Sequence, residues 1–351
     1  MPKQYSKTYD YLIIGQGLAG SLLAHRLIKL GQNVLLLDNA HHNSASQVAA
    51  GLINPLTGHR LNLTDGFEEF FDVADRTYQN LNTAYKTTIY RRLKQTRLIK
   101  NAGQFEFYEK RKQQSEYQAY LSDVPEHNLL ESGFGFTGVE QSAIVDTKEL
   151  LLQSKSWLIA HQAYEQKQVN YDQLKSNDNG VQLNEIQAKR VIFCEGYQAI
   201  HNPWLSDLPF KLSKGDVLTI QTNMPANSLL SWGNWLASNS DGTNAKLGSS
   251  YVWNDLTHIK SEDSKKALFE SLQKHTSLNA AVIKHEVGIR PTTLQRKPFI
   301  GALNPSTKLR NAYCFNGFGS KGCLLIPYYA ELFAEHLINE TALPQELTKW
   351  L

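Results

Sequence analysis

Three glycines and one aspartate near the start of the chain have the spacing of a phosphate-binding turn. The segment Gly15-Gln16-Gly17-Leu18-Ala19-Gly20 directly follows the apolar run Tyr11–Ile14. In such a turn the first glycine allows the bend, the second lets the backbone approach a pyrophosphate, and the third lets the helix pack on the strand. The helix N-terminus then attracts the phosphates. Asp38 lies at the distance where an acidic side chain accepts hydrogen bonds from a ribose.

The residues around this turn have the pattern of a complete strand–helix–strand unit. Apolar residues recur at helical spacing over Leu22–Leu30, Gly31 is a typical helix end, and a second apolar strand follows at Val34–Leu37. A glycine turn alone is weak evidence, because such turns also occur for structural reasons. The whole unit predicts a bound dinucleotide. An arginine beside Asp38 would indicate a ligand with a 2′-phosphate, but the sequence has none there. The motif itself does not distinguish NAD from FAD.

The composition is that of an ordinary globular enzyme. The chain has 351 residues, 41% hydrophobic and 20% charged, with a net charge of +3, so charge gives no reason to expect nucleic acid or an anionic membrane. Cys194, Cys314 and Cys323 form neither a disulfide framework nor a zinc motif, which favours a reducing compartment. The polar start matches neither a signal peptide nor a membrane span. We therefore predict a cytoplasmic protein without a metal centre.

Segments far apart in the sequence resemble the D-amino-acid oxidase and glycine oxidase family. Ser46–Pro55, which reads SQVAAGLINP, is similar to the segment with which these enzymes wrap the pyrophosphate and the flavin edge. Gly288–Pro291 (GIRP), Lys297–Gly301 and Asn316–Gly322 have the order and spacing of the family's C-terminal signature. The resemblance implies FAD as the cofactor. It also implies non-covalent binding, because relatives that attach FAD use a cysteine near the arginine–proline pair, and this chain has none there. Cys314 and Cys323 are the alternative points of attachment.

The resemblance assigns a set of residues to FAD. The glycines of Gly317–Gly322 permit a loop whose amides point at the flavin pyrimidine ring, and the dipole of the helix that follows would stabilise the anionic reduced flavin. An ordinary glycine-rich turn is the alternative. Glu195 stands where small residues are usual and needs water or a cationic partner. The predicted cofactor-binding residues are Gly15, Gly17, Leu18, Ala19, Gly20, Asp38, Asn39, Ala49, Ala50, Gly51, Leu52, Glu195, Gly196, Gly317, Phe318, Gly319, Ser320, Lys321 and Gly322.

Two residues are predicted to bind the substrate. In the family that this chain resembles, the arginine of the Gly-x-Arg-Pro segment forms a forked ion pair with the substrate carboxylate, which suits the planar guanidinium of Arg290. A structural ion pair is the alternative. Arg296 and Lys297 are expected to face solvent. Trp235 stands where relatives often have a tyrosine, and an indole donates one hydrogen bond and fills more volume, so the substrate is expected to be smaller or differently held.

The chain is expected to pass more than once between two domains. The predicted fold is α/β, with a Rossmann-type FAD-binding domain and a second, mainly antiparallel-sheet substrate domain. Strand candidates for the second domain are Lys214–Ile220, Ser231–Ala237 and Lys246–Trp253, and residues 67–120 are expected to form a helix, a strand pair and another helix. The predicted FAD-binding domain comprises residues 1–66, 140–205 and 286–351, and the substrate domain comprises residues 67–139 and 206–285.

The resemblance implies oxidation of a small amine or amino acid. The substrate carboxylate would bind Arg290, hydride transfer to the flavin would give an imine, and water would hydrolyse it. A neutral amine needs no protein base, so proximity and desolvation would be the main terms. Oxygen is expected to reoxidise the flavin. One alternative is a dehydrogenase for a 2-hydroxy acid, which could use the same arginine without forming peroxide. Another is a flavin-binding protein with a degenerate active site, in which Arg290→Ala would leave every rate unchanged.

A tRNA-modifying flavoprotein is a further alternative from another class. Its RNA-binding surface would be a basic segment, although the nearly balanced charge and the lack of an aromatic–basic signature favour a solvated face. The residues of this basic segment are Arg91, Arg92, Lys94, Arg97 and Lys100.

Three histidines near the predicted flavin segment, His41, His42 and His59, have no metal-ligand spacing and are expected to lie in loops.

Overall fold

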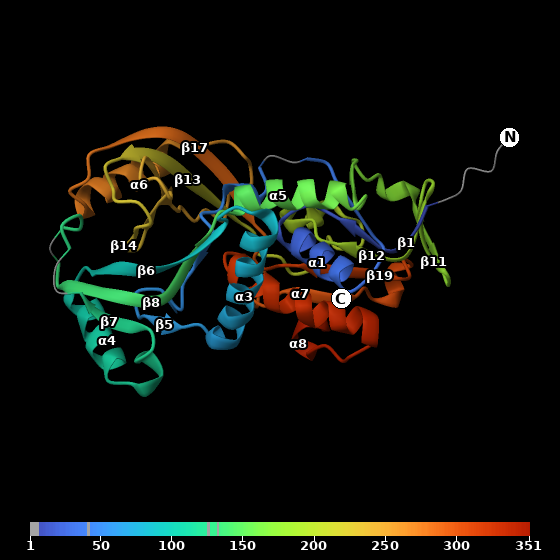
Figure 1. Ribbon diagram of the computed structural model, residues 1–351, viewed down its shortest axis with the longest axis horizontal. Helices are drawn as coiled ribbons and strands as arrows, with labels where there is room; N and C mark the ends of the chain where they lie inside the picture. Colours follow the sequence, from blue (N-terminus) through green and yellow to red (C-terminus); the bar gives the residue numbers. More distant parts are fainter. Residues whose placement is uncertain (1–6, 41–42, 125–126, 132) are drawn as a thin grey trace. The chain divides into compact units, whose positions relative to one another are not determined.

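The computed structural model describes residues 7–40, 43–124, 127–131 and 133–351, and the chain divides into two compact units (Figure 1). Unit 1 comprises Met1–Gln47, Thr147–Ser213 and Ile289–Leu351. Unit 2 comprises Val48–Asp146 and Lys214–Gly288. Each unit is therefore built from segments that are far apart in the sequence.

Unit 1 contains a mixed sheet whose central strands are parallel. The strand order is β10-β11-β12-β1-β2-β9, with β19 on β12 and β18 on β19, and the described residues of this sheet form eight strands. The pairs β12–β1, β1–β2, β2–β9 and β12–β19 are parallel. The strands are β1 (Lys7–Ile14), β2 (Val34–Asp38), β9 (Tyr164–Gln166), β10 (Leu174–Asn177), β11 (Gly180–Leu183), β12 (Ile186–Phe193), β18 (Phe299–Ala302) and β19 (Ala312–Asn316).

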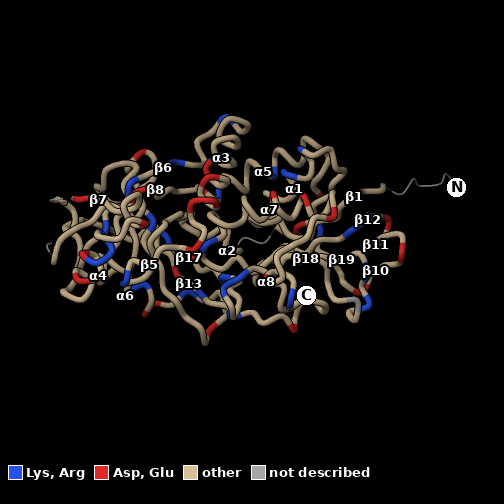
Figure 2. The backbone as a smooth tube through the Cα atoms, turned by 90° about the horizontal axis from the view of Figure 1, so that it is seen from below, with Lys and Arg blue, Asp and Glu red and all other residues tan. Residues whose placement is uncertain are grey.

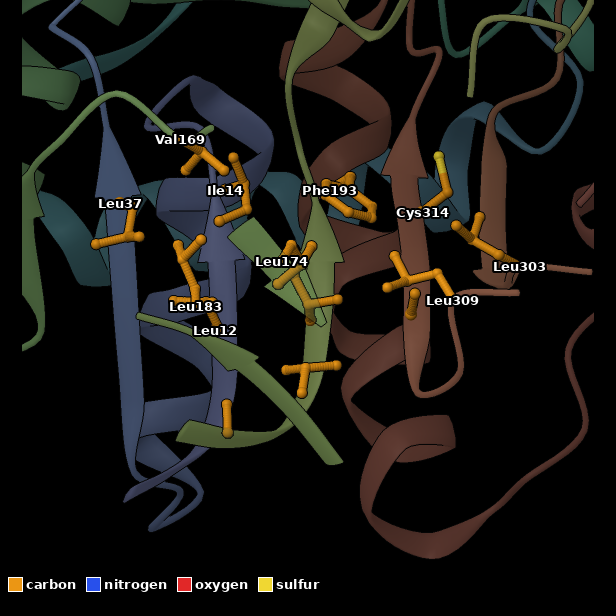
Figure 3. Packing of buried hydrophobic residues seen from close by; sticks show 14 of the residues in the cluster. Leu12, Ile14, Leu37, Val169, Leu174, Leu183, Phe193, Leu303, Leu309 and Cys314 are labelled. Carbon is orange, nitrogen blue, oxygen red and sulfur yellow. The ribbon is translucent and has the colours of Figure 1, made fainter. Parts of the chain in front are cut away.

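The core of unit 1 explains why its central strands are apolar on both faces. Leu12, Ile14, Leu37, Phe193 and Cys314 pack together on one face (Figure 3). The intervening residues of β1 and β2 are buried as well, as expected for a parallel sheet covered on both sides. The helices of unit 1 are α1 (Leu18–Lys29), α2 (Ala45–Val48), α5 (Thr147–Ala160), α7 (Gly322–Asn339) and α8 (Gln345–Thr348), with 3-10 turns η2 (Tyr171–Gln173), η3 (Gly196–His201) and η4 (Pro305–Thr307).

Unit 2 is built around a larger, mostly antiparallel sheet. The order is β17-β13-β16-β15-β14-β6-β8-β3, with β7 on β8, and β14 runs parallel to β6. One face packs its leucines against Leu268 and Leu272 of α6 (Glu262–His275). The strands are β3 (Leu52–Ile53), β6 (Tyr90–Ile99), β7 (Leu121–Val124), β8 (Gly135–Val145), β13 (Ser213–Thr222), β14 (Leu229–Ser231), β15 (Trp235–Ser238), β16 (Asn244–Gly248) and β17 (Ala280–Arg290). The remaining elements are β4 (Leu56–Thr57), β5 (Asn62–Leu63), α3 (Phe67–Tyr85), α4 (Ala102–Lys112) and η1 (Ser115–Tyr117).

The units differ from the predicted domains at residues 48–66, 140–146 and 286–288, which belong to unit 2, and at residues 206–213, which belong to unit 1. The two stretches nearest the N-terminus, 48–66 and 140–146, pair with each other. The reason is backbone pairing, because β3 pairs antiparallel with the end of β8. Gly51 approaches this strand so closely that an added Cβ would lie 1.7 Å from the Val145 carbonyl oxygen. A resemblance to a flavin-binding segment could not indicate this attachment.

Two local predictions are corrected by the structure and a third is confirmed. Residues 67–120 contain one long strand, β6, between α3 and α4, where a strand pair was expected. The strand expected at residues 231–237 is interrupted by the turn of a hairpin, because Gly233 adopts a φ of +113° between β14, which ends at Ser231, and β15, which begins at Trp235. Arg296 and Lys297 are exposed as expected, but in the loop after β17, where Lys297 pairs with Glu346.

The basic segment on β6 is split between the two faces of the strand. Arg92 and Lys94 belong to one alternation and pair with Asp75 and Glu140. Basic and acidic residues are interspersed along both units (Figure 2). This pairing weakens the interpretation of the segment as a single RNA-binding surface.

Several properties that bear on localisation and metal binding are also visible. No helix in the described part of the chain has the length and apolar character needed to cross a membrane. Across the same residues, no group of His, Cys, Asp and Glu side chains is arranged to hold a metal ion. His59 is exposed, and His41 and His42 lie outside the described residues.

Candidate cofactor and substrate site

The glycine turn after β1 is shaped by its own packing at two positions and left open at the third. Gly15 has a φ of +105°, and an added Cβ would lie 2.6 Å from the Cys194 carbonyl oxygen. At Gly20 the Cβ would lie 2.0 Å from the Gly15 carbonyl oxygen. At Gly17 the nearest atom is the Ser46 Oγ at 3.4 Å, an ordinary contact. The backbone at Gly17 therefore leaves room for a phosphate at the start of α1.

Asp38 fixes the turn to the end of β2. Its Oδ1 accepts a hydrogen bond from the Gln16 N–H at 2.8 Å and its Oδ2 accepts one from the Ala40 N–H at 2.7 Å. Each carboxylate oxygen can accept a second bond, so Asp38 can also receive ribose hydroxyls. The neighbouring Asn39 donates to Gln168 at 3.0 Å.

The carboxyl ends of β12 and β19 are joined by a residue absent from the predicted set. Asn316 donates from Nδ2 to the Gly196 carbonyl at 2.9 Å, and its Oδ1 accepts from the Gly317 N–H at 2.7 Å. Gly317 has a φ of +87°, and an added Cβ would lie 2.6 Å from Thr293 Cγ2. Asn316 thus holds the predicted flavin loop at the edge where the parallel strands end. Asn316 begins the Asn316–Gly322 segment that carries the family resemblance, but no role of its own was predicted for it.

Two helices begin at this part of unit 1 with N-cap residues whose side chains make no capping hydrogen bond. In α1 the N-cap is Gly17, in α7 it is Lys321, and neither helix has an acidic residue in its first turn. The Leu18 N–H of α1 donates to the Ser46 Oγ at 3.1 Å, so an anionic ligand would meet the other N–H groups of that first turn and those of α7. The loop before α7 contains Phe318, which is buried, and Ser320. This arrangement fits the phosphates and the reduced flavin ring of FAD.

Glu195 finds neutral partners, whereas the sequence suggested water or a cation. The Tyr171 hydroxyl donates to Oε1, and Asn202 donates from Nδ2 to Oε2 at 2.7 Å. Burial raises the pKa of Glu195 to about 7, against the lowering effect of these two donors. The Glu195 carboxyl is thus able to carry a proton near neutral pH.

The cysteines near the sheet edge are buried free thiols. Burial raises the thiol pKa of both Cys194 and Cys314 well above the usual value. A thiol that resists ionisation is a poor nucleophile. This environment disfavours attachment of the flavin through Cys314.

In unit 2 the predicted flavin segment and the residues just after it are held by three side chains from one face of the sheet. Lys246 donates to the Ala49 carbonyl at 2.9 Å. Asn54 donates to Gln95 at 2.6 Å, and Arg97 donates to the Gly58 carbonyl. Leu52 packs in a small apolar cluster with Trp235. Sequence analysis missed Lys246 and Gln95, because only the strand register aligns them. Ala50 lies between these anchored positions.

The two predicted substrate residues lie at strand ends in different units. Trp235 begins β15 in unit 2, and an added Cβ on Gly248 would lie 2.5 Å from its Cζ2 atom, so its ring packs over that glycine. Arg290 ends β17, which begins in unit 2 and crosses into unit 1 at Ile289, and is partly buried. Gly319 donates to the Pro291 carbonyl at 3.2 Å, which ties the residue after Arg290 to the flavin loop. Unit 1 therefore brings together the glycine turn, Asp38, Gly196, the 316–322 loop and the Arg290 backbone.

This edge of parallel strands, with its glycine turn and the N-termini of two helices, has the features of a dinucleotide-binding site. A family model described as "FAD dependent oxidoreductase" matches residues 10–336, and the chain belongs to this family. The protein is accordingly an FAD-dependent oxidoreductase, and FAD is its cofactor. The residues described above fit that cofactor.

Solved structures with the same fold extend over nearly the whole chain. An iminodiacetate oxidase from Chelativorans sp. BNC1 has a TM-score of 0.75 at 18% identity, covering 97% of this chain and 98% of its own. A glycine oxidase from Geobacillus kaustophilus has a TM-score of 0.77 at 16% identity, with coverage of 97% and 98%. An L-amino acid deaminase from Proteus vulgaris has a TM-score of 0.78 at 13% identity, with coverage of 97% and 96%. These likenesses concern the fold.

Proposed function

We propose that the protein oxidises the C–N bond of an amine or amino acid that carries a carboxylate, with oxygen as the electron acceptor. The observation that carries this proposal is the hydrogen bond from Gly319 to the Pro291 carbonyl, since it attaches the backbone beside Arg290 to the flavin loop. The names of the three similar structures, which include a glycine oxidase and an iminodiacetate oxidase, support the same substrate class.

The chemistry follows from what the residues can do. FAD, held without a covalent bond, supplies the acceptor for a hydride from the carbon next to the nitrogen. Arg290 orients the substrate through a forked ion pair with its carboxylate. The amine enters neutral, so the protein need not supply a base. Water then hydrolyses the imine, and oxygen is reduced to hydrogen peroxide.

The test is an absorbance spectrum of the holoenzyme, followed anaerobically while glycine, sarcosine, proline and a panel of amino acids of both hands are added in turn. Bleaching of the flavin bands by one of these compounds, and peroxide formation after air is admitted, are the expected results. Bleaching by a 2-hydroxy acid alone would replace the proposal with a hydroxy-acid dehydrogenase. Bleaching by an amine without peroxide would retain the substrate class and overturn oxygen as the acceptor.

A further inference from the structure

The loop that follows β12 attaches the segments of the predicted cofactor edge of unit 1 to one another. Its backbone packs on the glycine turn, since an added Cβ on Gly15 would lie 2.6 Å from the Cys194 carbonyl oxygen and 3.3 Å from the Glu195 Cα atom. The next carbonyl, that of Gly196, accepts the hydrogen bond from Asn316 at 2.9 Å. Glu195 therefore lies between the glycine turn and the predicted flavin loop.

The side chain of Glu195 joins two further segments of the same unit. Tyr171 in η2 donates its hydroxyl to Oε1, and Asn202, directly after η3, donates from Nδ2 to Oε2 at 2.7 Å. Asn202 is buried, and the Trp204 ring packs on Tyr171 in a T-shaped arrangement with a centroid distance of 5.8 Å. These contacts hold the carboxyl in place, so that it ionises where it lies.

Within the described part of the chain, no cation balances this carboxyl. Glu195 forms no ion pair with a described Lys, Arg or His side chain, and its partners Tyr171 and Asn202 are neutral donors. The ionisable residues at the surface of the two turns, Asp172 of η2 and His201 of η3, are exposed, so solvent screens their charges. An ionised Glu195 is thus a charge that neutral hydrogen bonds alone stabilise.

The other titratable groups around Glu195 stay neutral at ordinary pH. Burial raises the pKa of the Tyr171 hydroxyl and of the Cys194 and Cys314 thiols well above their usual values, and the charge of Glu195 raises all three further. Burial raises the pKa of Glu195 itself to about 7. Glu195 is therefore the member of this cluster whose charge changes between about pH 6 and about pH 8.

FAD brings negative charge to the same edge of unit 1. Its phosphates are negatively charged, and the backbone at Gly17 leaves room for a phosphate in the turn that packs on Glu195. The helix N-termini favour this charge, whereas an ionised carboxyl opposes it. A protonated Glu195 removes the repulsion and keeps its contacts, because the Tyr171 hydroxyl can change from donor to acceptor.

We propose that Glu195 is a positioning residue whose protonated form binds FAD, so that the protein takes up a proton at Glu195 when the cofactor binds. The proton lies on Oε1 and is donated to the Tyr171 hydroxyl, while Oε2 continues to accept from Asn202. Where Glu195 is ionised, repulsion from the phosphates weakens cofactor binding. The inference concerns the cofactor alone and does not depend on the substrate.

The first test measures the affinity for FAD and requires no turnover. The holoenzyme is diluted in buffers from about pH 5.5 to about pH 8.5, and the fluorescence of released flavin gives the FAD dissociation constant. We expect this constant to rise about tenfold or more over the range, since a pKa shift of one unit on binding corresponds to a factor of ten. In Glu195→Gln, which keeps the shape but cannot ionise, it should stay within about threefold of the low-pH wild-type value throughout.

Two further variants separate charge from packing. Glu195→Ala loses both hydrogen bonds, so its dissociation constant should be higher than that of Glu195→Gln and independent of pH. Glu185→Gln, at an exposed turn of the same unit, should keep the wild-type pH dependence. The proposal is overturned if the wild-type constant does not change with pH, if Glu195→Gln keeps the wild-type rise, or if Glu195→Gln binds FAD as weakly as Glu195→Ala.

Tyr171→Phe keeps the proposal testable if the Glu195 variants do not fold. The Tyr171 hydroxyl stabilises the ionised carboxyl and so lowers the pKa of Glu195. Without this donor the pKa should rise, and the increase in the FAD dissociation constant should move to higher pH by about half a unit or more. A purely structural loss would weaken binding equally at each pH and leave the midpoint where it is, which would contradict the assignment.

Discussion

The cofactor site of unit 1 and the sheet face of unit 2 are built in different ways. In unit 1, backbone groups at the ends of parallel strands form the site, and glycines make room for them, as at Gly15 and Gly20. In unit 2, side chains in register across neighbouring strands form the face, as with Arg97, Ser231 and Trp235. Substitutions that add atoms should therefore disturb the cofactor site of unit 1 most, whereas substitutions that shorten a side chain should disturb the sheet face of unit 2 most.

The largest effect should come from an added methyl group in unit 1. In Gly20→Ala the new Cβ would lie 2.0 Å from a backbone oxygen, so the helix must shift from the strand. We expect a loss of about 3 kcal/mol or more in the free energy of unfolding, together with loss of bound FAD. Denaturant unfolding and the flavin content measure both. Gly103→Ala in α4, where the nearest atom is 3.7 Å away, is the matched control and should not destabilise.

Removal of a side chain should affect the substrate and spare the cofactor. Arg290→Met is expected to lower kcat/KM for a carboxylate substrate about 100-fold, within the range of about 2–5 kcal/mol for a lost charged partner. The FAD dissociation constant should stay within about threefold, because Arg290 was assigned no cofactor contact. Steady-state kinetics and flavin fluorescence give the two readouts. Arg296→Met, at an exposed position in the following loop, should behave as wild type. Equal losses in both variants would contradict the assigned role.

A smaller effect should follow from the one buried carboxyl of the cofactor edge. Because burial raises the pKa of Glu195 to about 7, its contribution to stability is present below the pKa of an ordinary glutamate and is lost as the pH rises toward 7. Glu195→Gln should therefore melt about 2–4 °C above wild type at pH 8, and the advantage should vanish or reverse near pH 5. Thermal unfolding at both pH values tests this. Glu185→Gln, at an exposed turn, should show no such dependence.

The smallest effect is expected where one aromatic ring replaces another. Trp235→Phe keeps an apolar ring over Gly248 but fills less volume. We expect a change of about threefold to tenfold in the KM of the substrate, with little change in thermal stability. A kinetic comparison of several substrate sizes would reveal it, because larger substrates should gain relative to small ones. An unchanged ranking would remove Trp235 from the substrate pocket.

Much of unit 1 could be predicted because its signals are local. The glycine turn, the apolar strands and Asp38 lie within one short stretch of sequence, and the structure places Asp38 on the turn itself. The Gly-rich segment before α7 was also recognisable, although the role of Asn316 as a link to Gly196 was not. A hydrogen bond between distant strand ends leaves no periodic pattern in the sequence.

The face of unit 2 could not be predicted, for a related reason. Arg97 and Ser231 become neighbours only through the parallel pairing of β6 and β14, and no turn or motif in the sequence predicts that pairing. The alternation of β6 would have separated Arg97 from Arg92 had the strand been recognised as one long element. Likewise, the close approach of Gly51 to Val145, which by itself requires a glycine there, could not be predicted, and the contact of Gly51 with the cofactor stays a prediction.

The hydrogen bonds of Asn316 also bear on how the protein ages. An asparagine followed by a glycine is the pair most prone to deamidation, in which the following backbone nitrogen attacks the side-chain carbonyl carbon. Here Asn316 is 2% exposed, its amide group is engaged with Gly196, and the Gly317 N–H is bound to its Oδ1. The ring closure would require these bonds to break. Deamidation of Asn316 should therefore occur in molecules whose sheet edge has locally unfolded, and the deamidated fraction after storage should report how often that unfolding occurs.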